Sequence, residues 1–154
     1  MEYTFKIEKF EENYPELEHL YREHYAEMKA RLEADGVPIS DYNPRLMEYV
    51  GLERAGELLN WVIRDGAGQA VGYSNIYLTR DMHNQDLICQ EDTIFVTKAH
   101  RNGVGRKLVQ TILADLKERG VKRVLVSPAT DLRVEKIWAR MGFKTVSVVM
   151  AYTF

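Results

Sequence analysis

The chain has 154 residues, of which 45% are hydrophobic and 29% charged, and its formal net charge is −2. This composition is typical of a folded globular protein, and the length suits one domain spanning residues 1–154. The charge argues against general nucleic-acid binding, which usually leaves a strongly basic surface. No apolar run approaches the roughly 20 residues of a membrane helix, and the N-terminus lacks a signal-peptide pattern.

Cys89 is the single cysteine, which excludes a disulfide within the chain. A lone thiol suits a reducing compartment, so we expect a cytoplasmic protein. His19 and His24 are five residues apart and so do not share a helix face, and no histidine or cysteine pair has ligand spacing. No metal site is predicted.

The first third of the chain is predicted to form one strand and two helices. Residues 3–10 alternate apolar and polar side chains, as a half-buried strand does. Asn13 and Pro15 signal the start of a helix that Asp35-Gly36 ends. A shorter helix follows between residues 43 and 56.

The middle of the chain is predicted to form strands. Leu58–Arg64 and Ala70–Leu78 are rich in β-forming residues and flank a glycine-containing turn, which predicts an antiparallel hairpin. A polar loop over residues 80–86 precedes a further strand from Leu87 to Thr97.

The last third alternates helices and strands. Apolar residues from Leu108 to Leu116 mark an amphipathic helix that ends at Arg119-Gly120. A short apolar strand over residues 121–127 follows, then a helix from Thr130 to Met141, then one or two closing strands in residues 143–154. The predicted fold is a mixed α/β domain with the element order β-α-α-β-β-β-α-β-α-β(β).

The segment His100-Arg101-Asn102-Gly103-Val104-Gly105 joins a strand directly to the amphipathic helix. Backbone N–H groups in the first turn of a helix lack intrahelical partners, and the helix dipole places partial positive charge there. Glycines allow a phosphate to approach the backbone, and Arg101, Arg106 and Lys107 add countercharge. The turn would suit a pyrophosphate, although a plain glycine turn before a helix is the alternative.

Two other phosphate-binding motifs do not match. The P-loop pattern G-x-x-x-x-G-K-[ST] is absent from the chain. The dinucleotide fingerprint G-x-G-x-x-G fails because Leu108 stands at its third glycine position.

A strand, turn and helix with this glycine spacing resembles the acyl-CoA loop of the GNAT superfamily of N-acetyltransferases. The segment Ile137-Trp138-Ala139-Arg140-Met141-Gly142-Phe143 is similar to the end of that family's fourth helix. The resemblance implies a GNAT-like mixed sheet with helices on both faces. It also implies acetyl-CoA as co-substrate, without a metal, and a primary amine as acceptor on a small molecule or a protein.

The resemblance also implies which residues hold the cofactor. The backbone of the strand before the loop would pair with the pantetheine arm, and amides of the loop would bind the pyrophosphate. The residues so implied are Phe95, Val96, Arg101, Asn102, Gly103, Val104, Gly105, Arg106 and Trp138.

Two positions depart from the family pattern. His100 stands where relatives carry arginine or glutamine, although backbone amides would still bind the anion. Trp138 stands where many relatives have a tyrosine that protonates the CoA thiolate, which an indole cannot do near neutral pH. Trp138 would then pack against the pantetheine or simply lie in the core, and the proton would come from water, Tyr73, Tyr77 or Tyr152.

Glu91 and Asp92 are the candidates for the general base, because relatives often place an acidic residue on this strand. Strand alternation puts the two carboxylates on opposite faces, so at most one faces the acceptor. We expect Glu91 to be that residue and keep Asp92 as the alternative. Exposed carboxylates at a sheet edge would explain both equally well.

Other functions stay open at this point. A CoA-binding or regulatory module with weak catalysis would explain the missing tyrosine. An interaction protein could instead use the fold for a homodimer, through the β-rich segment Val146–Tyr152. Tyr21, Tyr25 and Tyr49 either line the acceptor side, as the helical segment does in relatives, or belong to the core.

Overall fold

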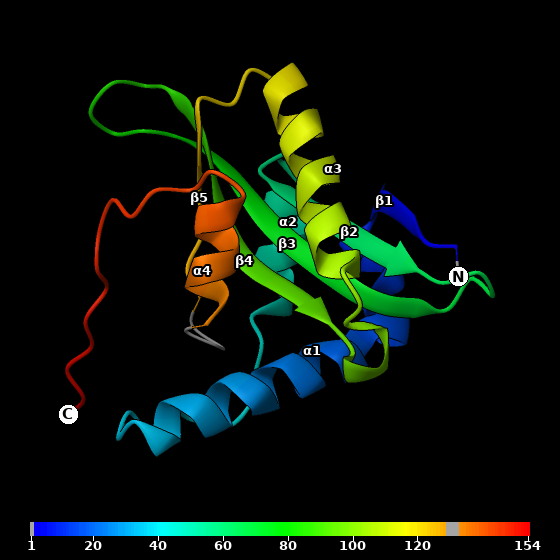
Figure 1. Cartoon of the computed structure of the whole chain (residues 1–154), viewed down its shortest axis with the longest axis horizontal. Helices are drawn as coiled ribbons and strands as arrows, with labels where there is room; N and C mark the ends of the chain where they lie inside the picture. The colour runs from blue at the N-terminus through cyan, green and yellow to red at the C-terminus, as the bar shows by residue number, and fades with distance from the viewer. Residues whose placement is uncertain (1, 129–132) are drawn as a thin grey trace. The chain divides into compact units, whose positions relative to one another are not determined.

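One mixed sheet organises the structure, a computed structural model that describes residues 2–128 and 133–154 (Figure 1). Its strands lie in chain order: β1 (Thr4–Glu8), β2 (Leu58–Arg64), β3 (Ala70–Arg80), β4 (Leu87–Val96) and β5 (Arg123–Leu125). The first four pair antiparallel, whereas β4 and β5 are parallel. A parallel pair needs a crossover, and α3 (Val104–Glu118) supplies it. The predicted hairpin is confirmed, with β2 at the predicted boundaries.

The chain divides into two compact units. The first contains the residues up to Tyr21 and Pro44–Val126, and the second contains Arg22–Asn43 and Ser127–Phe154. The sheet and α3 belong to the first unit. The single domain expected over residues 1–154 stays a prediction.

The face of the sheet under α3 is apolar. α3 places Leu108, Ile112 and Leu116 at four-residue spacing, and each of them is at least 96% buried. They pack against strand residues such as Trp61 and Ile76. Figure 1 shows α3 lying along the sheet. This burial fixes the start of α3 relative to the end of β4.

The opposite face carries polar and aromatic side chains. α1 (Phe10–Ala34) sends its first half to this face, where Asn60 Nδ2 of β2 and Asn75 Nδ2 of β3 both donate to the Tyr21 hydroxyl. α2 (Leu46–Arg54) lies beside β2 and brings Tyr49 to the same face. Helices therefore cover both faces of the sheet, as predicted, and the mixed α/β fold is confirmed.

α1 begins earlier than predicted, at Phe10 rather than near Asn13. The carboxylate of Glu53, in α2, accepts hydrogen bonds from the backbone N–H groups of Phe10 (2.7 Å) and Glu11 (3.3 Å). These are first-turn donors that have no intrahelical partner. The cap comes from 43 residues away in sequence, so no local pattern announces it. Pro15 consequently lies inside the helix.

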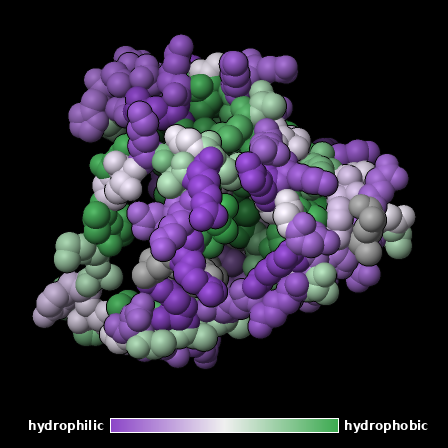
Figure 2. Space-filling view, viewed as in Figure 1, coloured by the Kyte–Doolittle hydropathy of each residue, from purple (hydrophilic) through white to green (hydrophobic). Residues whose placement is uncertain are grey.

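The closing strands predicted in residues 143–154 are wrong: the structure has no strand there. The segment is rich in β-forming residues, but its large apolar side chains are exposed, from 75% at Val146 to fully at Phe154. Figure 2 shows apolar groups at the surface along it, at the left of the view. β-propensity becomes a strand only where a neighbouring backbone provides hydrogen bonds, and no described strand pairs with this segment. α4 (Val134–Arg140) precedes it, and the predicted start at Thr130 lies outside the described residues.

Candidate functional site

The loop between β4 and α3 folds as a short 3₁₀ turn, η1 (Lys98–His100), followed by Gly103 as the N-cap of α3. Gly103 has φ +95°, a left-handed conformation that glycine adopts without steric cost. No side chain caps this end of the helix, and the first intrahelical hydrogen bond is donated by the N–H of Lys107. The N–H groups of Val104, Gly105 and Arg106 therefore remain available to an anion.

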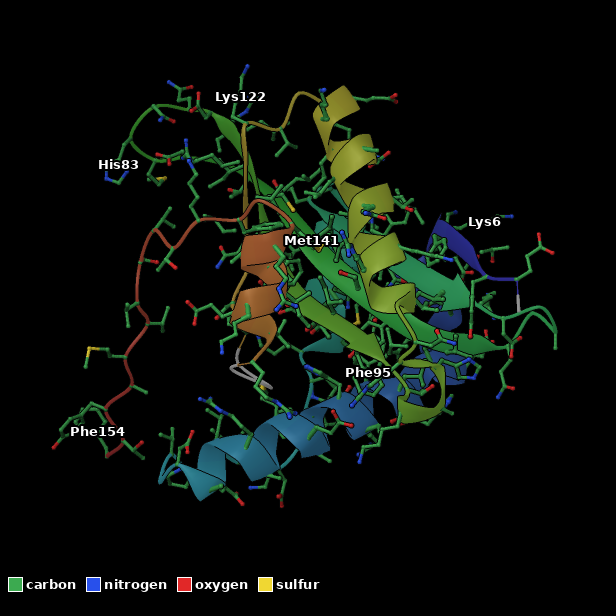
Figure 3. All side chains as sticks on the ribbon, in the orientation of Figure 1. Lys6, His83, Phe95, Lys122, Met141 and Phe154 are labelled. Carbon is green, nitrogen blue, oxygen red and sulfur yellow. The ribbon has the colours of Figure 1, made fainter. Side chains whose placement is uncertain are left out.

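Two side-chain contacts anchor the loop. The hydroxyl of Tyr3, just before β1, lies 2.9 Å from His100 Nδ1, and the two rings meet edge to face. Arg101 Nε donates to the Val96 carbonyl at 2.8 Å, and its guanidinium lies over the Phe95 ring. Figure 3 shows Phe95 at the end of β4, next to this loop. Arg101 thus braces the loop against the strand, a role that the sequence did not suggest.

The electrostatic character of the loop is positive. Lys98, Arg106 and Lys107 are exposed, and none of them forms an ion pair with a described residue. No acidic residue occurs between positions 98 and 114. Side-chain charge and helix dipole therefore have the same sign at the start of α3.

β4 changes its pairing in the middle. Its first half pairs with β5 only at Ile88, Cys89 and Gln90, so the edge of residues 91–96 that faces away from β3 has no strand beside it in the described part of the chain. On the β3 side, Glu91 lies opposite Ile76 and Thr93 opposite Asn75. This register leaves Asp92 as the extra residue of a β-bulge.

The bulge decides how the two acidic candidates lie. Asp92 is exposed, and its Oδ2 accepts hydrogen bonds from the hydroxyls of Tyr49 (3.0 Å) and Thr93 (3.3 Å). Glu91 lies opposite Ile76, a residue of the core under α3, and its charge acts on the Cys89 thiol. The regular alternation of side chains along a strand could not assign Glu91 and Asp92 to faces of the sheet, because the bulge shifts that alternation by one residue. Of the pair, Asp92 joins the polar face.

Cys89 is fully buried in β4. Burial above all, and secondarily the negative charge of Glu91, raises the pKa of its thiol to about 12. The side chain is therefore a protonated thiol near neutral pH and has no nucleophilic character.

A buried polar network next to Asp92 was not predicted. Asn13 Nδ2 donates to Asn60 Oδ1, and Asn60 Nδ2 donates to Asn75 Oδ1, both at 2.7 Å. Asn75 in turn donates to the Tyr21 hydroxyl at 2.8 Å. The available signal was the presence of an asparagine in each of two adjacent, otherwise apolar strands.

The three tyrosines predicted as proton donors, and Trp138, lie in different environments. Tyr73 is 1% exposed and stacks on Tyr21 with ring centroids 3.9 Å apart. Tyr77 is half-buried and interacts with Asp92. In the second unit, Trp138 is buried and packs edge to face on Phe143, whereas Tyr152 is exposed.

Two kinds of feature are absent from the described residues. No cluster of three metal-ligating side chains occurs within residues 2–128 and 133–154. No helix in these ranges has the length and apolar character needed to cross a membrane.

The structure thus combines a mixed sheet, a bulge in its fourth strand and a helix that begins after that strand with glycine at its N-cap. The model of the Acetyltransferase (GNAT) family matches residues 7–143, and the chain belongs to this family. No curated protein sequence matches the chain significantly.

Solved structures share the fold over almost the whole chain. A mutant of the BH1408 protein from Bacillus halodurans superposes with a TM-score of 0.77 at 16% identity, covering 98% of this chain and 99% of that one. An aminoglycoside acetyltransferase from an uncultured soil metagenomic sample gives 0.74 at 15% identity, covering 100% and 99%. AAC(6')-Iy, solved with a bisubstrate analogue that contains CoA, gives 0.70 at 14% identity, with the same coverage. At such identities the likeness establishes the fold.

Proposed function

We propose that the protein transfers an acetyl group from acetyl-CoA to a primary amine. The observation that carries the proposal is the junction of β4 and α3, where the unpaired strand edge of residues 91–96 leads into an uncapped, basic helix start. Membership of the GNAT family supports acetyl-CoA as the ligand of this junction.

In this proposal the pyrophosphate lies against the amides from Arg101 to Arg106, with Asn102, Gly103, Val104 and Gly105 between them. The pantetheine arm runs along the free edge of β4 at Phe95 and Val96. The Val96 carbonyl already accepts a hydrogen bond from Arg101, so a pantetheine amide would share that acceptor or use a neighbouring group. Trp138 stays among the residues proposed to bind the cofactor.

Acetyl transfer requires a neutral amine. The acceptor arrives as an ammonium ion, and Asp92 takes its proton, directly or through one water. The amine nitrogen then attacks the thioester carbonyl, the C–N bond forms, and the C–S bond breaks. The nitrogen loses its second proton as the amide forms, and this proton reaches the departing CoA thiolate through water or through the Tyr77 hydroxyl, which is reprotonated in the same step. Of the three tyrosines predicted for that role, Tyr77 is the one beside the carboxylate.

The acid-base assignment favours Asp92 over Glu91, the residue expected from the sequence. Asp92 is exposed on the polar face, where an acceptor can reach it, whereas Glu91 lies opposite a core residue. Glu91 is retained as the alternative base.

The test has two stages. Acetyl-CoA should raise the thermal unfolding temperature, because a ligand that binds only the native state stabilises it. A thiol-release assay over a panel of small amines and of peptides with free N-terminal or lysine amines should then identify the acceptor class. Absence of stabilisation at millimolar acetyl-CoA would refute the proposal.

A CoA-binding module with weak catalysis is the second candidate, because Trp138 replaces the usual tyrosine and packs on Phe143. That function predicts stabilisation by CoA without thiol release from acetyl-CoA with any amine. A cytoplasmic location and a homodimer through Val146–Tyr152 are further proposals; size-exclusion chromatography with light scattering tests the dimer.

A further inference from the structure

Three side chains from three elements meet at the β4 bulge. Tyr49 of α2 donates its hydroxyl hydrogen bond to Asp92 Oδ2 at 3.0 Å. The Tyr77 hydroxyl of β3 lies near both side chains and interacts electrostatically with Asp92 and Tyr49. Burial above all, and then the negative charge of Asp92, raises the pKa of both tyrosines. Both hydroxyls are therefore protonated donors at neutral pH.

Asp92 accepts hydrogen bonds from hydroxyl groups but has no cationic partner among the described residues. No ion pair joins it to any residue in the described part of the chain. Its neighbours are Thr93 and Glu91 on β4, and Tyr49 and Tyr77 from the flanking elements. From α1, Tyr21 is the titratable group that interacts with Asp92 electrostatically. An exposed carboxylate held only by hydroxyl donors is oriented without being paired to a cation, and so is open to a cationic ligand.

The Tyr49 ring is itself held in place. It stacks on Phe10, with ring centroids 5.0 Å apart and the planes 27° from parallel. The backbone N–H of Phe10 donates to Glu53, which stands one helical turn after Tyr49 on α2. Stacking and capping thus fix the start of α1 against α2, and the Tyr49 hydroxyl is preorganised toward the bulge.

We propose that Tyr49 and Tyr77 are positioning residues, which hold the ionised Asp92 carboxylate in one orientation to receive the ammonium group of the acceptor. The inference rests on the proposed function and deepens it. In the reaction, the acceptor N–H bond breaks, its proton passes to Asp92, and the electron pair stays on the nitrogen that attacks the thioester. Without the two hydroxyls, the carboxylate loses both its orientation and the donors that favour its charged form.

The test measures kcat and KM for both substrates against pH with the best amine of the panel. Loss of a donor to a carboxylate disfavours its ionised form. The acid limb of kcat/KM for the amine should therefore move to higher pH by about half a unit to one unit in Tyr49→Phe and in Tyr77→Phe. KM for acetyl-CoA should stay unchanged in both. Tyr42→Phe is the matched control, since the ring of Tyr42 contacts Arg22 and Tyr25 instead.

A double-mutant cycle distinguishes the inference from the proposed function. If Tyr49 acts through Asp92, Tyr49→Phe should leave the residual rate of Asp92→Asn unchanged, so that the two effects are not additive. Additive effects, or unshifted acid limbs in both tyrosine variants while Asp92→Asn is inactive, would overturn the inference alone. Full activity of Asp92→Asn would instead overturn the assignment of Asp92 as the base. Thermal unfolding of each variant confirms that the comparison is made between folded proteins.

Discussion

The two faces of the sheet differ in chemistry although the same strands form both. The face under α3 is a continuous apolar core, in which Leu108 and Leu116 are at least 99% buried. The face under α1 and α2 contains buried asparagines, stacked tyrosines and the Asp92 carboxylate. One face therefore holds the proposed phosphate-binding loop in place, while the other is where the acceptor chemistry is proposed. Changes on the first should cost stability, and changes on the second should alter activity more than stability.

The largest expected loss of stability is on the apolar face. Leu108→Ala removes a fully buried side chain of α3 and leaves a cavity, which should lower the free energy of unfolding by about 2–5 kcal/mol. Urea denaturation measures it. A loss below about 1 kcal/mol would mean that α3 does not pack as described.

The polar network should contribute less. Asn75→Ala removes the acceptor of the Asn60 amide and the donor to Tyr21, which should cost about 1–3 kcal/mol. The same denaturation measurement applies, with Asn84→Ala, at an exposed turn, as a control. If the two variants were equally stable, the network would be dispensable for folding.

A smaller effect on stability is expected at Glu8 of β1, which accepts a hydrogen bond from Asn13 at the edge of the asparagine network. The hydrogen bond from Arg64 lowers the pKa of Glu8 from its ordinary value of 4.5, more than burial raises it. A group with a lowered folded-state pKa stabilises the protein above its unfolded value and loses that contribution as the pH falls through the folded value. Glu8→Gln should therefore cost about 1 kcal/mol at pH 7.

Denaturation of wild type and Glu8→Gln at intervals from neutral to about pH 2.5 measures that effect. The difference between them should shrink once the pH falls below about 4.5, the ordinary value for glutamate. A difference that does not change with pH would show that the charge of Glu8 is not involved.

The smallest expected effect is at the loop anchor. Tyr3→Phe removes the hydroxyl that contacts His100 Nδ1 and leaves the aromatic packing in place. KM for acetyl-CoA should rise by a few-fold, since one modest hydrogen bond is lost, while KM for the amine stays unchanged. A change in the amine KM instead would place Tyr3 on the acceptor side.

Local signals predicted most of the fold. The β-forming residues of β2, the hairpin turn and the apolar stripe of α3 are each signals from residues close in sequence, and the three elements they predicted were confirmed. The early start of α1 was missed because its cap, Glu53, is distant in sequence. The closing strands in residues 143–154 were wrong because a strand also depends on a partner.

The site was predicted less completely than the fold. The glycine turn was located from its own residues. The expectation that Glu91 and Asp92 lie on opposite faces depended on regular alternation, which the bulge at Asp92 interrupts. The roles of Tyr3, Tyr49 and Tyr77 arise from contacts between elements that lie far apart in the sequence, so no motif could indicate them.

The most direct test of acetyl-CoA binding at the start of α3 compares the two ends of that helix. Gly103 and Gly120 flank α3, both have positive φ, and an added Cβ would meet no atom within 4 Å at either position. Ala at each should therefore cost a similar amount of stability, about 1 kcal/mol. Calorimetric titration with acetyl-CoA should show at least about tenfold weaker binding for Gly103→Ala, the equivalent of about 1.4 kcal/mol, and unchanged binding for Gly120→Ala. Equal affinity in the two variants would contradict the assignment of the loop as the acetyl-CoA site.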